Sequence, residues 1–95
     1  MINELILMGR VVAPPPELKY WESGGGKIVP ITKLQINTNK DTHEICVFGD
    51  TAERVFDEID VGDLILVKGK IKSRIEDRKK LIEIYARTVE KIKED

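Results

Sequence analysis

The sequence predicts an all-β domain with one short helix. Short runs of β-branched and apolar residues recur along the chain, Gly- and Pro-rich clusters separate them, and only one stretch has apolar residues at helical spacing. With 95 residues, we expect a single domain over residues 1–95. An apolar content of 41% and a net charge of −1 exclude a disordered chain. No run approaches the roughly 20 apolar residues of a membrane span, so no membrane partner is expected.

Five strands are expected, each a run of apolar and β-branched residues between turn signals. Gly9 inside the first run marks a bulge or a close backbone approach, and Pro30 is expected to break or bulge the second. The prolines at 14–16 end the first ladder, because proline has no N–H to donate, and residues 17–21 follow as a short extended segment. Residues 76–78 predict a tight hairpin between the last two strands. The expected strands cover residues 2–12, 27–37, 43–49, 64–75 and 79–89.

One helix is expected at residues 51–59, where four apolar residues repeat at i, i+3, i+4 and i+7: Ala52, Val55, Phe56 and Ile59. Asp50 is the expected N-cap with Glu53 completing a capping box, and Gly62 is the expected stop signal. So short a helix must be held by packing onto the strands. The order β-β-β-α-β-β favours the OB-fold, a five-stranded Greek-key barrel with its helix between strands three and four. A Greek-key or SH3-like barrel of another order stays open, because the pattern does not fix strand order.

One face of the fourth strand is basic. Side chains alternate between the faces of a strand, so the odd positions of 64–75 predict a core face. The even positions carry a row of four cations: Lys68, Lys70, Lys72 and Arg74. The same alternation places Phe48 on the face opposite Ile45 and Val47. A basic row beside exposed rings suits a single-stranded nucleic acid, with cations along the phosphates and rings stacked on bases. The alternative is a solvated strand face whose lysines resist aggregation.

The overall charge argues at first against a nucleic-acid partner, because such domains are usually basic. The acidic residues, however, gather on the expected helix and its exit: Glu53, Asp57, Glu58, Asp60 and Asp63. The local field rather than the total charge governs phosphate binding, so a net charge of −1 does not exclude nucleic acid.

The remaining reactive groups predict neither catalysis nor a metal or cofactor site. His43 and Cys46 are the only His and Cys, fewer than the three or four ligands of a zinc site. A single Cys cannot form an internal disulfide, and no signal peptide is visible, so we expect a cytoplasmic protein. Residues 24–26 lack the Lys-Ser/Thr step of a phosphate-binding loop and predict a turn. Of Tyr20 and Trp21, we expect one in the core and the other exposed as a stacking ring.

Six motifs, in order along nearly the whole chain, resemble those of the bacterial single-stranded DNA-binding proteins. Residues 1–11, MINELILMGRV, resemble the opening pattern M-x-N-x-V-x-L-x-G-R/N-L, and residues 43–49, HEICVFG, resemble H-x-V-V-x-F-G. The other matches are PELKY at 16–20 with SGG at 23–25, AE at 52–53 with VGD at 61–63, VKGKIKSR at 67–74 and EIYARTV at 83–89.

This resemblance implies an OB-fold, a single-stranded DNA partner and a homo-oligomer, usually a tetramer, with a dimer as the other possibility. By position it implies DNA contacts for Phe48, Lys72 and Arg74, a basic-aromatic pair near the DNA at Lys19 and Tyr20, and a subunit interface at His43. With the basic row and Trp21 added, the expected DNA-binding residues are Lys19, Tyr20, Trp21, Phe48, Lys68, Lys70, Lys72 and Arg74.

Four positions depart from the family pattern. Thr42 and Glu76 stand where aromatic residues are usual, and Glu44 and Asp50 where basic residues are common. The family's disordered tail with an acidic, Phe-terminated tip is not expected, as the sequence stops at Lys93-Glu94-Asp95, so we expect any recruitment of other proteins to use the barrel. The departures keep a second hypothesis open, a scaffold subunit resembling the primosomal replication proteins, with weak or no DNA binding. RNA binding is a third hypothesis, and an enzyme is the least favoured.

Overall fold

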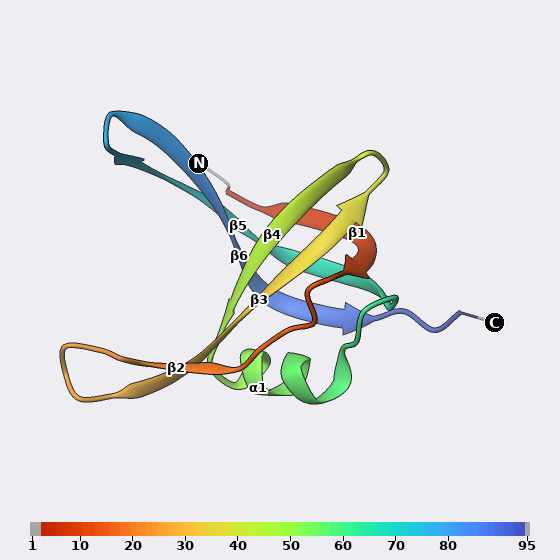
Figure 1. Ribbon diagram of the computed structural model, residues 1–95, viewed down its shortest axis with the longest axis horizontal. Coiled ribbons are helices and arrows are strands. Elements are labelled where there is room, and N and C mark those ends of the chain that lie inside the picture. Colours follow the sequence, from red (N-terminus) through yellow and green to blue (C-terminus); the bar gives the residue numbers. More distant parts are fainter. Residues whose placement is uncertain (1–2, 95) are drawn as a thin grey trace.

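Residues 3–94, which the computed structural model describes apart from the side chain of Arg74, form six strands and one helix (Figure 1). In chain order the elements are β1 (Leu5–Val12), β2 (Lys19–Glu22), β3 (Ile28–Thr38), β4 (Asp41–Phe48), α1 (Gly49–Glu58), β5 (Leu64–Glu76) and β6 (Lys79–Lys91). The helix therefore lies where the sequence predicts it. The short extended segment after the prolines is an additional strand, β2.

Five of the strands form a closed ring. The sheet order is β1-β5-β6-β4-β3-β2, and a further pairing of β1 with β3 closes the ring while β2 extends β3 outside it. β1 pairs with two strands: Leu5–Arg10 pair with β5, and Arg10–Val12 pair with β3. Gly9 permits this crossing, because a Cβ at Gly9 would overlap the carbonyl oxygen of Asn37. The close backbone approach predicted at Gly9 is thus confirmed.

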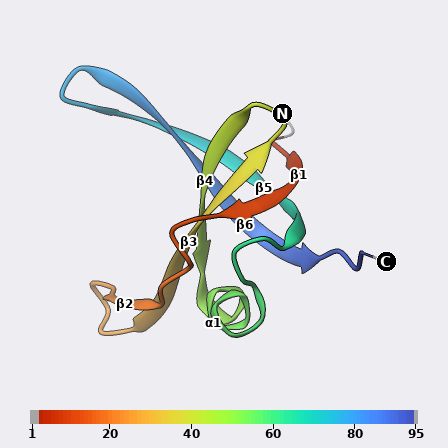
Figure 2. The same ribbon diagram turned by 45° about the vertical axis from the view of Figure 1, so that its right-hand side comes forward.

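The core fills this ring, and α1 covers one end of it (Figure 2). The strands contribute eight buried residues: Val11, Leu34, Ile36, Ile45, Val47, Ile65, Val67 and Val89. From the helical segment Ala52, Val55 and Ile59 are buried with them, whereas Phe56 is 46% exposed. The predicted apolar stripe is therefore wrong at Phe56. Successive residues of a helix are rotated by about 100° around its axis. Phe56 therefore lies at the edge of the helix face on which Val55 is buried.

The predicted capping box is also wrong. The helix begins at Gly49, its N-cap is Phe48 in extended conformation, and no side chain caps it by hydrogen bonding. Asp50 instead lies within the first turn, where a carboxylate interacts favourably with the helix dipole. The C-cap is Ile59, so Gly62 belongs to the following turn, where its N–H donates to the carbonyl of Val11.

Two hairpins project from the same side of the barrel (Figures 1 and 2). We call them the β2–β3 arm, residues 19–30, and the β5–β6 arm, residues 71–83. The predicted hairpin of the second arm is confirmed, with Asp77 and Arg78 at φ of 50° and 64°, as a two-residue type I′ turn requires. The odd positions of β5 were expected to be core throughout, which is wrong in this arm. β1 pairs with β5 only as far as Gly69, so beyond it Ile75 is 81% exposed.

The expected break at Pro30 is wrong as well. β3 runs without interruption from Ile28 to Thr38, and Pro30 pairs with Tyr20 of β2. On its other edge, the pairing of β3 with β4 begins only at Ile31. At Pro30, no strand of residues 3–94 is therefore paired with the β4 side of β3, the side that a backbone N–H would face. Proline is tolerated at such a position because it has no N–H to donate. Within the same range, no helix is long and apolar enough to cross a membrane.

Candidate nucleic-acid interface

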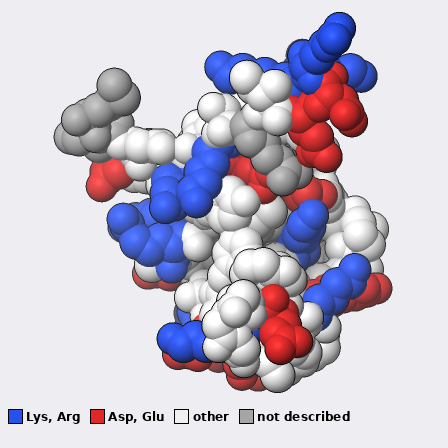
Figure 3. Space-filling view, turned by 90° about the vertical axis from the view of Figure 1, so that its left-hand side faces the viewer, with Lys and Arg blue, Asp and Glu red and all other residues white. Residues whose placement is uncertain are grey.

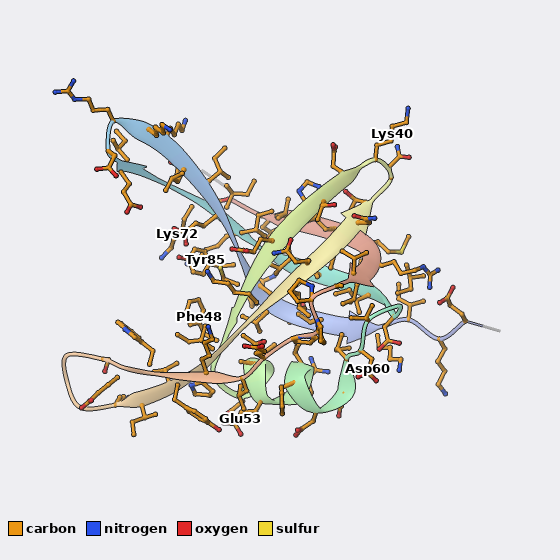
Figure 4. All side chains as sticks on the ribbon, viewed as in Figure 1. Lys40, Phe48, Glu53, Asp60, Lys72 and Tyr85 are labelled. Atoms are coloured by element: carbon orange, nitrogen blue, oxygen red, sulfur yellow. The ribbon has the colours of Figure 1, made fainter. Side chains whose placement is uncertain are left out.

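A groove of about 720 Å³ lies between the two arms, at the point where both leave the barrel. We call it the ring groove. Its lining includes side chains from β2, β3, β4, β5 and β6: Trp21, Ile31, Phe48, Lys70, Lys72, Tyr85 and Arg87. In Figure 4, Lys72, Tyr85 and Phe48 follow one another across the space between the arms. The groove thus combines three aromatic rings with three cationic side chains.

Phe48 and Tyr85 stack at the centre of the ring groove. Their ring centroids are 5.4 Å apart and the ring planes differ by 12°. The parallel pairing of β4 with β6 sets Cys46 opposite Tyr85, and Phe48, two residues after Cys46, lies on the same face. The predicted outward orientation of Phe48 is therefore found in the structure, whereas the sequence reasoning missed Tyr85. The alternation of Glu83, Tyr85 and Arg87 along the last strand could have indicated that Tyr85 lies on a face with charged residues.

Two further contacts hold the Tyr85 ring. Its hydroxyl donates a hydrogen bond of 2.5 Å to Oε2 of Glu83. On the β5 side, Nζ of Lys72 lies 5.1 Å from the ring centroid, within the range of a cation–π interaction. The ring is thereby fixed at its edge and over its face before any ligand arrives.

A β-bulge places Tyr85 on the basic side of the sheet. β5 and β6 pair Lys68 with Thr88 but Gly69 with Ala86, which leaves Arg87 as the extra residue. The bulge exchanges the two faces of β6, so Val89 is buried after it, while Tyr85 before it shares a face with Lys70 and Lys72. Gly69 is needed at this point, because a Cβ there would overlap the carbonyl oxygen of Tyr85.

The cations of β5 do not all line the ring groove. Lys70 and Lys72 line the ring groove, whereas Lys68 is exposed between Ile6 and Thr88 on neighbouring strands and does not line it. The side chain of Arg74 lies outside the described part. Arg87, which the sequence reasoning did not select, lines the groove. Figure 3 looks onto the side from which both arms project and shows Lys and Arg beside uncharged atoms, with acidic side chains among them.

The acidic helix lies away from this surface. Figure 4 places Glu53 and Asp60 at the end of the molecule that α1 covers, apart from Lys72 and Tyr85. Glu53 and Asp60 thus lie apart from the ring groove, as the sequence predicts, whereas Glu83 lies beside it, opposite Lys72. Because salt screens distant charges, the cations that line the groove and the neighbouring Glu83 should act on a ligand there more strongly than the net charge of −1 does.

Comparison with known proteins identifies the family. Residues 2–92 match the model of the single-strand binding protein family. The chain belongs to this family. The family is non-catalytic, and the five-strand ring with one helix is its OB-fold, as the sequence predicts. No curated protein sequence matches the chain significantly.

Solved structures of the family share the fold at low sequence identity. The SSB domain of a Synechococcus protein matches with a TM-score of 0.75 and 19% identity, over 94% of each chain. The single-stranded DNA-binding protein of Thermus aquaticus matches with a TM-score of 0.77 and 22% identity, over 97% of this chain and 50% of that one. The second single-stranded DNA-binding protein of Mycobacterium smegmatis, SSBb, matches with a TM-score of 0.73 and 18% identity, over 96% and 87%.

The other candidate residues of this family member occupy different surroundings. Tyr20 and Trp21 are 64% and 57% exposed, so the expectation that one lies in the core is wrong. β2 pairs only with the part of β3 that extends beyond the ring, so neither face of β2 reaches the core. Trp21 lines the ring groove, and Lys19 lines a separate hollow.

His43 lies outside the groove. It is half-buried near the β3–β4 turn, and its Nε2 is 2.8 Å from Oγ1 of Thr38. Cys46 is buried on the groove side of β4, as the alternation predicts for an even position. Among the described residues, no group of three His, Cys, Asp or Glu side chains is placed to hold a metal ion.

Two of the four departures from the family pattern, Thr42 and Glu44, have local partners. Thr42 donates from Oγ1 to Oδ1 of Asn37 at 2.6 Å. Glu44 accepts a hydrogen bond from Gln35 at 2.9 Å and lies 3.5 Å from Nζ of Lys33. Lys33 therefore compensates part of the negative charge of Glu44, which reduces the repulsion of a phosphate.

Proposed function

We propose that this protein binds single-stranded DNA in the ring groove without catalysing a reaction. The observation that carries the proposal is the stacked pair of Phe48 and Tyr85 between the lysines of β5 and the exposed Trp21. Aromatic rings stack on any base, at about 1–3 kcal/mol per base, and neighbouring cations follow the phosphates. Membership of the single-strand binding family supports the same function.

Within this proposal the contacts have distinct roles. Phe48, Tyr85 and Trp21 stack on bases, while Lys70, Lys72 and Arg87 attract phosphates at the groove. Lys68 and Arg74 continue the basic row along β5, and on the other arm Lys19 adds a cation and Tyr20 a ring for stacking. A protein that covers single strands in this way serves DNA replication, recombination or repair, in the cytoplasm.

The only Trp of the chain supplies a direct assay. Oligothymidylates should quench the fluorescence of Trp21 to saturation, because the side chain lines the groove and is exposed. The affinity should fall with salt, with a log–log slope near −0.7 per phosphate neutralised. Lys70→Glu/Lys72→Glu should weaken binding strongly. The control is Lys40→Glu/Lys93→Glu, which changes the net charge equally away from the groove.

A scaffold subunit is the second candidate function. The acidic side chains of Glu83 and Glu44 on the candidate face favour it, since they oppose phosphate attraction. Absence of binding to any oligothymidylate at low salt would contradict the first proposal and favour the scaffold. An oligouridylate bound as tightly as the oligothymidylate would show that DNA is not preferred over RNA.

We further propose a homo-oligomer, a tetramer in preference to a dimer, with His43 at a subunit interface. The half-burial of His43 in one chain and the exposure of Ile6 and Met8 on β1 support this. Light scattering should give a mass several times that of one chain. His43→Glu should lower this mass, and an unchanged mass would remove His43 from the interface.

A further inference from the structure

The ring of Tyr85 has a neighbour on each side along the sheet. β6 lies between β5 and β4 in the sheet order, and Tyr85 pairs with Lys70 of β5 and with Cys46 of β4. Phe48 of β4 therefore reaches the ring from one side, with 5.4 Å between the centroids, and Lys72 of β5 reaches it from the other. Figure 4 shows the same order, with Tyr85 between Lys72 and Phe48. Both faces of the ring are thus occupied in this structure.

A base can stack on Tyr85 only after one of these two neighbours has moved. Phe48 is the less movable of them, because its rigid ring is stacked on Tyr85 and is only 38% exposed. Lys72 is exposed, and its charge sits at the end of a flexible four-carbon stem. The face of Tyr85 on the β5 side is therefore the one that a base can take, once the Lys72 ammonium has left it.

The physical chemistry favours this exchange. The cation–π contact of an exposed lysine is weaker than the stacking of one base on an aromatic ring. The displaced ammonium also gains a new partner, because every base of a strand comes with a negatively charged phosphate. Glu83 keeps the Tyr85 ring in place meanwhile, since it accepts a hydrogen bond of 2.5 Å from the hydroxyl.

We propose that Lys72 is a gate on the Tyr85 ring. Its ammonium covers the face on the β5 side until a base of the single strand takes its place, and it then binds a phosphate of the same strand. This inference rests on the proposed function, because the ligand is the strand in the ring groove. It gives Lys72 a role that Lys70 does not share, since both line the groove but Lys72 is the one over the ring.

The NMR signals of the lysine side chains report where the ammonium lies. An aromatic ring shifts protons above its face upfield, so before DNA is added the ε-methylene protons of Lys72 should resonate upfield of those of Lys70. A saturating oligothymidylate should move the Lys72 signal downfield to about the position of the Lys70 signal and should shift the ring signals of Tyr85. In Tyr85→Leu the upfield position of Lys72 should be absent from the start.

Lys72→Ala and Lys70→Ala form a matched pair of variants, because each removes one exposed cation from the groove. Both should reduce the log–log slope of affinity against salt by about 0.7, the contribution of one phosphate. At high salt, where the phosphate contacts are screened, Lys72→Ala should bind about two- to fivefold more tightly than Lys70→Ala. The reason is that no cation then has to leave the ring.

Two results would overturn the gate and leave DNA binding in place. One is a Lys72 signal that stays upfield while the oligothymidylate quenches the fluorescence of Trp21. The other is a Lys72→Ala variant that binds no more tightly than Lys70→Ala at high salt. Absence of quenching and of every NMR shift at any salt concentration would instead overturn the proposed function.

Discussion

The rings of Phe48 and Tyr85 lie nearly parallel, 5.4 Å apart, although they come from strands that are distant in the sequence. The parallel pairing of β4 with β6 is what brings them together. Stacked aromatic rings form a rigid platform, so little conformational entropy is lost when a base is added to it. The pair therefore forms the centre of the candidate DNA surface.

Replacing the Tyr85 ring should weaken DNA binding more than replacing its hydroxyl. Tyr85→Ala removes one stacking platform and the support of Phe48, and should cost about 1–3 kcal/mol, or about five- to 150-fold in affinity. Tyr85→Phe keeps the ring and removes the hydroxyl that donates to Glu83, so its affinity should stay within a few-fold of the unaltered protein. Fluorescence titration of Trp21 measures both, and equal losses in the two variants would contradict stacking as the main contribution.

Removal of the Glu83 charge should strengthen binding. Glu83→Gln retains an oxygen that accepts from the Tyr85 hydroxyl but deletes a negative charge across from Lys72. We expect a gain of several-fold in affinity at low salt, which shrinks as salt screens the charge. Glu53→Gln on α1 is the control for the same change of net charge. A loss of affinity in Glu83→Gln would mean that the carboxylate itself contacts the ligand.

A methyl group at Gly69 should destabilise the fold. The new Cβ would overlap the carbonyl oxygen of Tyr85, so the β5–β6 ladder would have to shift at the bulge. We expect Gly69→Ala to lower the free energy of unfolding by about 1–3 kcal/mol in urea titrations. Gly25→Ala is the control, because a Cβ at Gly25 meets nothing within 4 Å. Equal stability of the two variants would contradict the tight packing at Gly69.

Acid should weaken the contact between Arg10 and Glu94. The hydrogen bonds from the Arg10 guanidinium, at 2.8 and 2.9 Å, hold the pKa of Glu94 below its ordinary value of 4.5, and they raise the pKa of Arg10. A lowered carboxyl pKa contributes stability that is complete above the ordinary value and is lost as the pH falls through the lowered one. Because both groups are exposed, salt should reduce this contribution.

Urea titrations over this acidic range measure the effect. The midpoint of the unaltered protein should fall more steeply with decreasing pH than that of Glu94→Gln, which has no carboxyl to titrate at this position. Glu4→Gln, also exposed, is the control for the loss of a carboxylate elsewhere. Parallel curves for the unaltered protein and Glu94→Gln would show that the pair does not stabilise the fold.

Much of the fold could be predicted because it depends on local patterns. The spacing of Ala52, Val55 and Ile59 predicted the helix, and the alternation of Ile65 and Val67 predicted a core face. Predictions failed where an element leaves the barrel. Trp21 and Ile75 are exposed because their strands extend beyond the ring, and no local pattern records where a strand loses its neighbours.

The sequence by itself determined the family, the succession along the chain of the helix and five of the six strands, and the outward direction of Phe48 and Lys72. All of these follow from motifs and from alternation along one strand. Only the tertiary structure decided which residues meet in the ring groove. Tyr85 reaches Phe48 because a bulge at Arg87 exchanges the faces of β6 and because β4 pairs with β6. Strand register is set by packing between distant segments, and a shift of one residue reverses every side chain that follows.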